Sequence, residues 1–228
     1  KVGLLKMDFL GLRTLSTMQR AVDIVREHRG LEIDLETIPL DDPEVYGLFQ
    51  RGETRGIFQF ESAGMRELLR RIQPDRLDDL IAANALYRPG PMVMIDDFVE
   101  RKHGRAAVTY PHPDLEDILG ETHGIMAYQE QVMRILNRLG DLHLRRAYKL
   151  IKAISKKKLK VIAAEKEPFL TGCAEHGMDD EKAAQIWELI THFGGYGFNK
   201  SHSARYAQIA YQTAYLKTHY PLEFMAAL

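Results

Sequence analysis

Prolines and glycines interrupt a long succession of helical patterns in this chain of 228 residues. Apolar side chains recur at helical spacing over residues 44–50, 65–72, 75–86, 92–102, 113–119, 127–139, 144–154, 157–170, 179–192 and 202–219. A first helix is expected between Thr14, its expected N-cap, and Gly30. Pro74 and the run Arg88-Pro89-Gly90-Pro91 cannot continue a helix. The pattern therefore predicts a mostly helical body, with Pro221 ending its last long helix.

Two short segments alternate as strands do. In the opening segment, Leu5, Met7 and Phe9 would share one face, and Lys6 and Asp8 the other. Spacing alone favours a surface ion pair on an edge strand. The alternative is that Asp8 holds a hard cation such as Mg2+ while Lys6 meets a phosphate.

The second segment is Gly56–Glu61, which is expected to be a short strand that leads into a helix capped by Ser62. The chain starts inside a strand-like segment and ends inside a helical pattern. It is therefore expected to be a piece of a longer protein.

Composition limits the kind of site that the chain can carry. The 31 Lys+Arg residues nearly balance the 32 Asp+Glu residues, so any electrostatic site must be local. Cys173 is the only cysteine, which excludes a disulfide framework and a cysteine-based zinc site. It is expected to be a small buried hydrophobe in a reducing, cytoplasmic protein. No run approaches the roughly 18 apolar residues of a membrane span.

One dense basic cluster stands out in this nearly neutral chain. Lys149, Lys152, Lys156 and Lys160 would form one stripe if a helix continued through Ser155. Like charges at this spacing repel one another, so the stripe suggests contact with a polyphosphate or a nucleic-acid backbone. The alternative is a solvated charged face.

Two other segments favour anion or nucleotide binding. The rigid Pro-Gly-Pro turn fixes the direction of Arg88, whose guanidinium suits phosphate or carboxylate recognition. The alternative is a plain corner between helices. Residues 193–200 form a glycine-rich loop before a helix, whose N-terminus attracts anions. In this loop Tyr196 and Phe198 are placed to stack on a base.

Five segments, taken in chain order, resemble one family: Leu5–Thr14 (LKMDFLGLRT), Gly56–Met65 (GIFQFESAGM), Tyr87–Pro91 (YRPGP), Gly124–Met133 (GIMAYQEQVM) and Gly195–Ser203 (GYGFNKSHS). Each piece is short, but the ordered set is specific. It is similar to bacterial C-family replicative DNA polymerases, the DNA polymerase III alpha subunit family.

The resemblance implies a mainly α fold in two parts. Residues 1–14 would be the C-terminal end of a palm domain built like the polymerase-beta nucleotidyltransferases, and residues 15–228 a helical fingers domain truncated at its C-terminus. Asp8 would be the third of three carboxylates that hold two Mg2+ ions. The other two would lie upstream of Lys1.

The resemblance also implies roles for the basic residues and for the glycine-rich loop. The implied triphosphate-binding residues are Lys6, Arg88, Lys152, Lys156 and Lys157. The implied neighbours of the nascent base pair and sugar are Tyr196, Gly197, Phe198, Asn199, Lys200, Ser201 and His202. Ile151 and Lys152 stand where many family members have two arginines. Lysine is a point charge rather than a bidentate fork.

The implied activity is template-directed addition of dNTPs to a primer 3′-hydroxyl by two-metal phosphoryl transfer. The implied partners are primer–template DNA and dNTP, and in the full-length protein a sliding clamp, a clamp loader and a proofreading exonuclease. The implied location is the bacterial cytoplasm, at the nucleoid and replisome. This chain alone is expected to be inactive, since it carries one of three metal carboxylates. The alternative is a non-catalytic helical module that binds nucleic acid or a partner.

Overall fold

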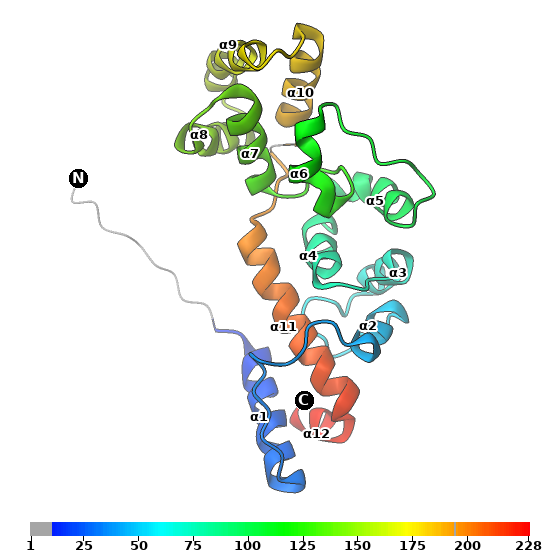
Figure 1. The fold of residues 1–228 in the computed structure, drawn as a ribbon. Coiled ribbons are helices and arrows are strands. Elements are labelled where there is room, and N and C mark those ends of the chain that lie inside the picture. The colour runs from blue at the N-terminus through cyan, green and yellow to red at the C-terminus, as the bar shows by residue number, and fades with distance from the viewer. Residues whose placement is uncertain (1–10, 194) are drawn as a thin grey trace, which may run out of the picture.

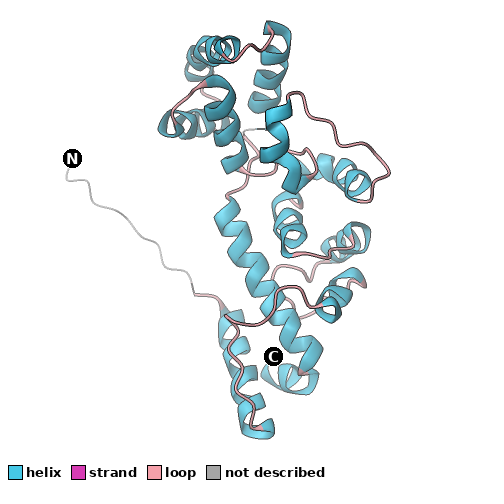
Figure 2. Cartoon of the chain, viewed as in Figure 1, coloured by secondary structure: helices cyan, strands magenta, loops and turns pink. Residues whose placement is uncertain are grey.

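The computed structural model describes residues 11–193 and 195–228, and this part of the chain is an elongated assembly of helices (Figure 1). It contains twelve α-helices and three short 3-10 helices. Within the described residues there is no β-sheet, and one isolated bridge joins Tyr128 to Phe198 (Figure 2). The predicted mainly α fold is confirmed. The predicted opening strand lies outside the described residues.

The first half of the molecule contains α1 (Arg13–Arg29), α2 (Pro43–Gln50), α3 (Ala63–Ile72), α4 (Leu77–Leu86), η1 (Pro91–Met94), α5 (Ile95–Lys102), η2 (Pro113–Leu115), α6 (Glu116–Leu119) and η3 (Gly120–Thr122). The second half contains α7 (Gln129–Gly140), α8 (Leu144–Ser155), α9 (Leu159–Glu175), α10 (Asp180–Phe193), α11 (Lys200–His219) and α12 (Pro221–Ala227). Pro221 does follow the long helix, and it also begins α12, where its missing N–H costs nothing.

Helix α11 runs through the middle of the molecule, and α4 packs along it (Figure 1). One core lies between α11 and helices α2 to α5, where Phe49, Phe60, Phe98 and Tyr211 are fully buried. The N-terminus of α3 is capped as predicted, because the Met65 N–H donates to Ser62 Oγ at 3.2 Å.

A second core is formed by helices α6 to α10 at one end of the molecule (Figure 1). Phe169 and Trp187 pack there with ring centroids 5.4 Å apart. Cys173 is buried in the same core, and burial is the main cause that raises its thiol pKa to about 11. Its predicted role as a small buried hydrophobe is confirmed.

A third core joins α1 to α12 and α11 at the opposite end (Figure 1). Helix α1 follows Leu12, which caps it without a side-chain hydrogen bond, so the prediction of Thr14 as N-cap was wrong. Gly30 ends the helix as expected, in a left-handed conformation with φ 65°. Among the described residues, no helix combines the length and apolar character that crossing a membrane requires.

Candidate functional site

The glycine-rich loop leaves α10 and is anchored to a segment about 70 residues earlier in the chain. The Phe198 N–H donates to the Ala127 carbonyl at 3.0 Å, and the Gln129 N–H donates to the Phe198 carbonyl at 2.9 Å. A Cβ on Gly197 would lie 3.2 Å from the backbone nitrogen of Gln129, so glycine allows this close approach. Asn199 ends the loop and caps α11, because its side chain accepts the His202 N–H at 2.8 Å.

Arg88, the residue before the Pro-Gly-Pro turn, lies against this loop. The Arg88 guanidinium donates to the Ala85 carbonyl at 2.9 Å and to the Tyr196 carbonyl at 2.8 Å. Its central carbon lies 4.4 Å from the centroid of the Phe198 ring. Burial lowers the pKa of Arg88. These two hydrogen bonds orient the side chain and bring Arg88 together with two of the predicted loop residues, Tyr196 and Phe198.

Gly90 makes this arrangement possible. Its φ of 102° belongs to a region that other residues rarely adopt, and a Cβ there would lie 2.5 Å from the Tyr196 ring. Tyr196 thus packs against the turn and keeps 46% of its surface exposed.

A series of aromatic rings follows from the loop along α11. Ring centroids are 5.5 Å apart for Phe198 and His202, 4.1 Å for His202 and Tyr206, and 5.0 Å for Tyr206 and Phe58. Ser201 and His202 are exposed in the first turn of α11. The predicted loop residues therefore form one end of a partly exposed aromatic surface that reaches the segment 56–61.

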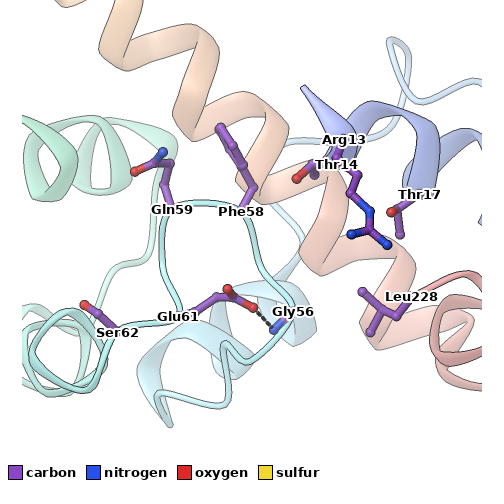
Figure 3. Close-up of a pocket in the computed structure, with 9 residues that line it drawn as sticks. All are labelled: Arg13, Thr14, Thr17, Gly56, Phe58, Gln59, Glu61, Ser62 and Leu228. Carbon is purple, nitrogen blue, oxygen red and sulfur yellow. Dashed lines mark hydrogen bonds between the residues drawn. The ribbon is translucent and has the colours of Figure 1, made fainter. Parts of the chain in front are cut away.

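Segment 56–61 is not a strand, so that prediction was wrong. The Ile57 N–H donates to the Thr54 carbonyl and the Phe60 N–H to the Ile57 carbonyl, which makes two successive turns. Ile57 and Phe60, three residues apart, enter the core. Phe58 and Gln59 between them face a cavity of about 580 Å³ (Figure 3).

The other side of this cavity is formed by Arg13, Thr14 and Thr17 of α1, with Leu228 beside them (Figure 3). Asp8 precedes Arg13 by five positions in the sequence. Lys6 and Asp8 both lie outside the described residues. Within the described residues, no group of three or more His, Cys, Asp or Glu side chains could hold a metal ion.

The predicted lysine stripe does not form, because the helix does not continue through Ser155. Helix α8 ends there, and the Lys157 N–H donates to the Ile154 carbonyl while the Lys158 N–H donates to the Ala153 carbonyl. This pair of bonds is the Schellman ending, with Lys157 at the left-handed position at φ 52°. Residues 156–158 are therefore a turn between α8 and α9.

That turn lies close to the glycine-rich loop. Lys157, Gly195 and Tyr196 line the same cavity of about 600 Å³, whose apolar wall includes Ile154 and Trp187. The fold thus brings together two segments that the sequence singled out separately.

Positive charge is concentrated around this turn. Residues 144–160 carry eight lysines and arginines and no acidic residue. Of these eight, only Arg146 is ion-paired within the described part of the chain, to Glu165. The Lys152 ammonium lies 4.3 Å from the centroid of the Tyr148 ring, and Lys156 caps α8.

The N-terminus of α11 faces carboxylates of the protein itself. Glu130 Oε2 accepts the Lys200 backbone N–H at 2.9 Å, and the Lys200 ammonium is ion-paired with Glu121. The backbone amide and the ammonium of Lys200 are thus both engaged within the chain.

Sequence reasoning missed the supporting residues of segment 124–133. Gln131 is polar, yet it is 1% exposed, and its side chain accepts the Ala127 and Tyr128 N–H groups at 2.9 and 3.0 Å. The available signal was its position three residues after the N-cap Tyr128, from which a Gln side chain reaches back.

Comparison with known proteins shows which family this chain belongs to. The model of the bacterial DNA polymerase III alpha subunit finger domain matches residues 14–177. The DNA polymerase III alpha subunit of Aquifex aeolicus is 48% identical over 228 residues, which cover 99% of this chain and 20% of that protein. The Pseudomonas aeruginosa subunit is 49% identical over 237 residues, covering 99% of this chain and 20% of that protein.

The Bacillus subtilis subunit is 47% identical over 227 residues, covering all of this chain and 20% of that protein. The chain thus spans about a fifth of the length of the curated relatives that it matches. Because the family model covers most of the chain and the relatives align along nearly all of it, this chain belongs to the bacterial DNA polymerase III alpha subunit finger-domain family.

Proposed function

We propose that this chain is the fingers segment of a bacterial replicative DNA polymerase and that it binds the incoming dNTP during primer extension. The observation that carries the proposal is the convergence of Arg88, the turn at Lys157 and the glycine-rich loop. These three segments lie far apart in the sequence and carry, respectively, a guanidinium, unpaired ammonium groups and two aromatic rings, of which Tyr196 is exposed.

The triphosphate would bind to the basic side of this arrangement. The unpaired cations of residues 144–160 repel one another, and a bound polyanion would offset that repulsion. Lys156 and Lys157 are exposed on the turn, and Lys157 lines the cavity together with Tyr196. The two backbone hydrogen bonds of Arg88 use Nε and Nη2, so its second terminal nitrogen takes part in neither.

The base and sugar would lie against the aromatic side. The Phe198 and His202 rings lie edge to face at the start of α11, with centroids 5.5 Å apart. Base stacking on aromatic rings is tolerant of sequence, as a polymerase requires. Ser201 and His202, both exposed there, are the proposed contacts to the sugar.

The metal ions would depend on residues outside the described part. Carboxylate oxygens are the ligands that Mg2+ prefers, and Asp8 would provide one of them. The described residues alone do not form a two-metal site. When bound, two Mg2+ ions would neutralise charge on the triphosphate and activate the primer 3′-hydroxyl.

The other partners would bind the rest of the full-length protein. Contacts with a sliding clamp, a clamp loader and a proofreading exonuclease would lie outside these residues. Primer–template DNA would be shared between this segment and the remaining domains, in the bacterial cytoplasm at the replisome.

The metal role is tested by Asp8→Ala in the full-length polymerase that contains this segment. Primer extension is expected to be lost, because a two-metal site would lose one of its three carboxylates. Extension at a near wild-type rate would rule out Asp8 as a metal ligand.

The triphosphate role is tested by Lys157→Ala in the same protein. The apparent KM for dNTP is expected to rise about tenfold, which corresponds to about 1.4 kcal/mol of lost binding. Lys152→Ala and Lys156→Ala should also raise it. Lys182→Ala is the matched control, since Lys182 lies at the far end of α10. Equal KM values for Lys157→Ala and Lys182→Ala would instead indicate that the lysines form a solvated charged face that does not bind the triphosphate.

A further inference from the structure

Segment 124–133 packs against the glycine-rich loop, but the nucleotide site proposed above uses none of its side chains. Its Glu130 carboxylate lies at the N-terminus of α11. Oxygen Oε2 accepts the Lys200 backbone N–H at 2.9 Å, and Oε1 accepts a hydrogen bond from Asn199 Nδ2 at 3.1 Å. Glu130 therefore holds both the last loop residue and the first helical residue.

A second carboxylate anchors the same point. Glu121 is ion-paired with the Lys200 ammonium, and its other oxygen lies 3.5 Å from Gln131 Nε2. Gln131 also donates to Thr122 Oγ1 at 2.8 Å, and both of these side chains are buried. Glu121 is thus linked to a buried hydrogen-bond network behind the loop.

This network is connected to the residues that would touch the nucleotide. The Phe198 N–H donates to the Ala127 carbonyl, and the Phe198 carbonyl accepts the Gln129 N–H, so the loop is hydrogen-bonded to residues just before Glu130. Arg88 in turn donates to the Tyr196 carbonyl of the same loop. A shift of the loop would therefore move the Phe198 ring and remove one of the hydrogen bonds that orient Arg88.

We propose that Glu130, with Glu121 behind Lys200, is a positioning residue that sets the glycine-rich loop and Arg88 for nucleotide binding. The inference rests on the proposed dNTP site. The Glu130 carboxylate accepts a hydrogen bond from the N-terminus of α11. The triphosphate therefore binds on the side of Arg88 and Lys157 instead. Glu130 stays in place when the nucleotide binds.

The opposite arrangement is that Glu130 occupies a phosphate position and is displaced by the nucleotide. The two arrangements predict opposite effects of the Glu130 charge on dNTP binding. A positioning carboxylate strengthens dNTP binding, whereas a competing carboxylate weakens it. The direction in which the KM moves when the charge is removed therefore distinguishes them.

The test is Glu130→Gln in the full-length polymerase, assayed by primer extension on a primer–template. Glutamine keeps the shape but turns an amide NH2 toward one of two donors. The KM for dNTP is expected to rise about tenfold with kcat changed less than twofold. Glu130→Asp retains the charge on a shorter side chain, and its KM for dNTP is expected to lie between those of the wild-type protein and Glu130→Gln. Glu188→Gln, on the exposed face of α10, is the matched control.

A second measurement separates positioning from a loss of folded protein. Fewer folded molecules would lower the maximal rate and leave the KM unmoved. A residue that acts through the loop and Arg88 should lose most of its effect on KM when Arg88→Ala is already present. Full additivity of Glu130→Gln and Arg88→Ala would contradict the inference.

The remaining outcomes are separable. A lower KM in Glu130→Gln would overturn the inference in favour of a competing carboxylate. An unchanged KM in Glu130→Gln, alongside a raised KM in Arg88→Ala, would overturn the inference alone. If Arg88→Ala also left the KM unchanged, the proposed nucleotide site would fail and the inference with it.

Discussion

At the scale of single residues, two glycines decide how closely α7 and α9 approach. A Cβ on Gly172 would lie 2.4 Å from the Gly140 carbonyl oxygen, and a Cβ on Gly140 would lie 2.2 Å from the Phe169 ring. Backbone atoms cannot rotate away from such an overlap. The contact therefore requires glycine at position 172 although the residue lies inside a helix.

Gly172→Ala is accordingly expected to lower the free energy of unfolding by about 1–3 kcal/mol, the usual cost of overpacking a core. Alanine has the better helix propensity by about 1 kcal/mol, so propensity alone predicts the opposite sign. Urea unfolding of the purified protein measures the difference. Gly195→Ala is the control, since the nearest atom to its Cβ is at 3.8 Å. Equal stability of the two variants would contradict this packing.

Residue identity predicted some local features of the fold and missed others. The cap at Ser62 and the left-handed end at Gly30 follow from side-chain chemistry that acts over a few positions. Lys157 adopts the left-handed conformation without being glycine, and nothing local in the sequence marks it. The lysine stripe was predicted wrongly for that reason.

At the scale of elements, the ends of α1 and α12 are joined by one ion pair. The Arg29 guanidinium donates to both oxygens of Glu223, at 2.6 and 3.0 Å. These hydrogen bonds are the main cause that holds the pKa of Glu223 below its ordinary value. A lowered pKa in the folded state means that folding favours the ionised carboxylate. The stabilisation is therefore present above about pH 4.5 and is lost as the pH falls through the folded-state pKa.

Glu223→Gln is expected to lower the melting temperature at pH 7, and this deficit should shrink as the pH falls from 5 toward 3. Thermal unfolding monitored by circular dichroism across this range measures it. Glu32 is exposed and forms no ion pair with the described residues, so Glu32→Gln should show no such trend. A deficit that stayed constant with pH would argue against the ion pair.

Helices were predictable from the sequence, whereas contacts between them were not. Apolar periodicity and proline breaks act within about twenty residues, and the expected helical segments correspond to observed helices, with shifted ends and a break after Ser155. The segment at Ile57 and Phe60 alternates like a strand, but tertiary packing buries both in successive turns. The bond between Gln129 and Phe198 joins distant parts of the chain, and no local pattern indicates it.

At the scale of the whole molecule, the candidate site lies where two cores meet. Tyr128 and Phe198 belong to the core built around α4 and α11, whereas Ile154 and Trp187 belong to the core of α6 to α10. The glycine-rich loop connects these two parts, and α11 carries the chain onward through the middle of the molecule (Figure 1). A nucleotide bound at this junction would contact both cores.

The resemblance of this chain to the polymerase family supplied an expected function that residue spacing alone did not. Spacing favoured a surface ion pair for Lys6 and Asp8, and only the ordered motifs favoured a catalytic role. The same motifs included segment 124–133 without giving it a function. Its contacts with the loop became visible only in three dimensions, because they join residues about 70 positions apart.

The central claim is that this segment binds the incoming dNTP through Arg88 and the loop that it holds. The most direct test is equilibrium binding of the next correct dNTP to the full-length polymerase on a primer–template whose primer lacks a 3′-hydroxyl. The dissociation constant is expected to rise at least about tenfold in Arg88→Ala, with primer–template affinity unchanged, because a positioned guanidinium is lost. An unchanged dissociation constant for dNTP in Arg88→Ala would contradict the account.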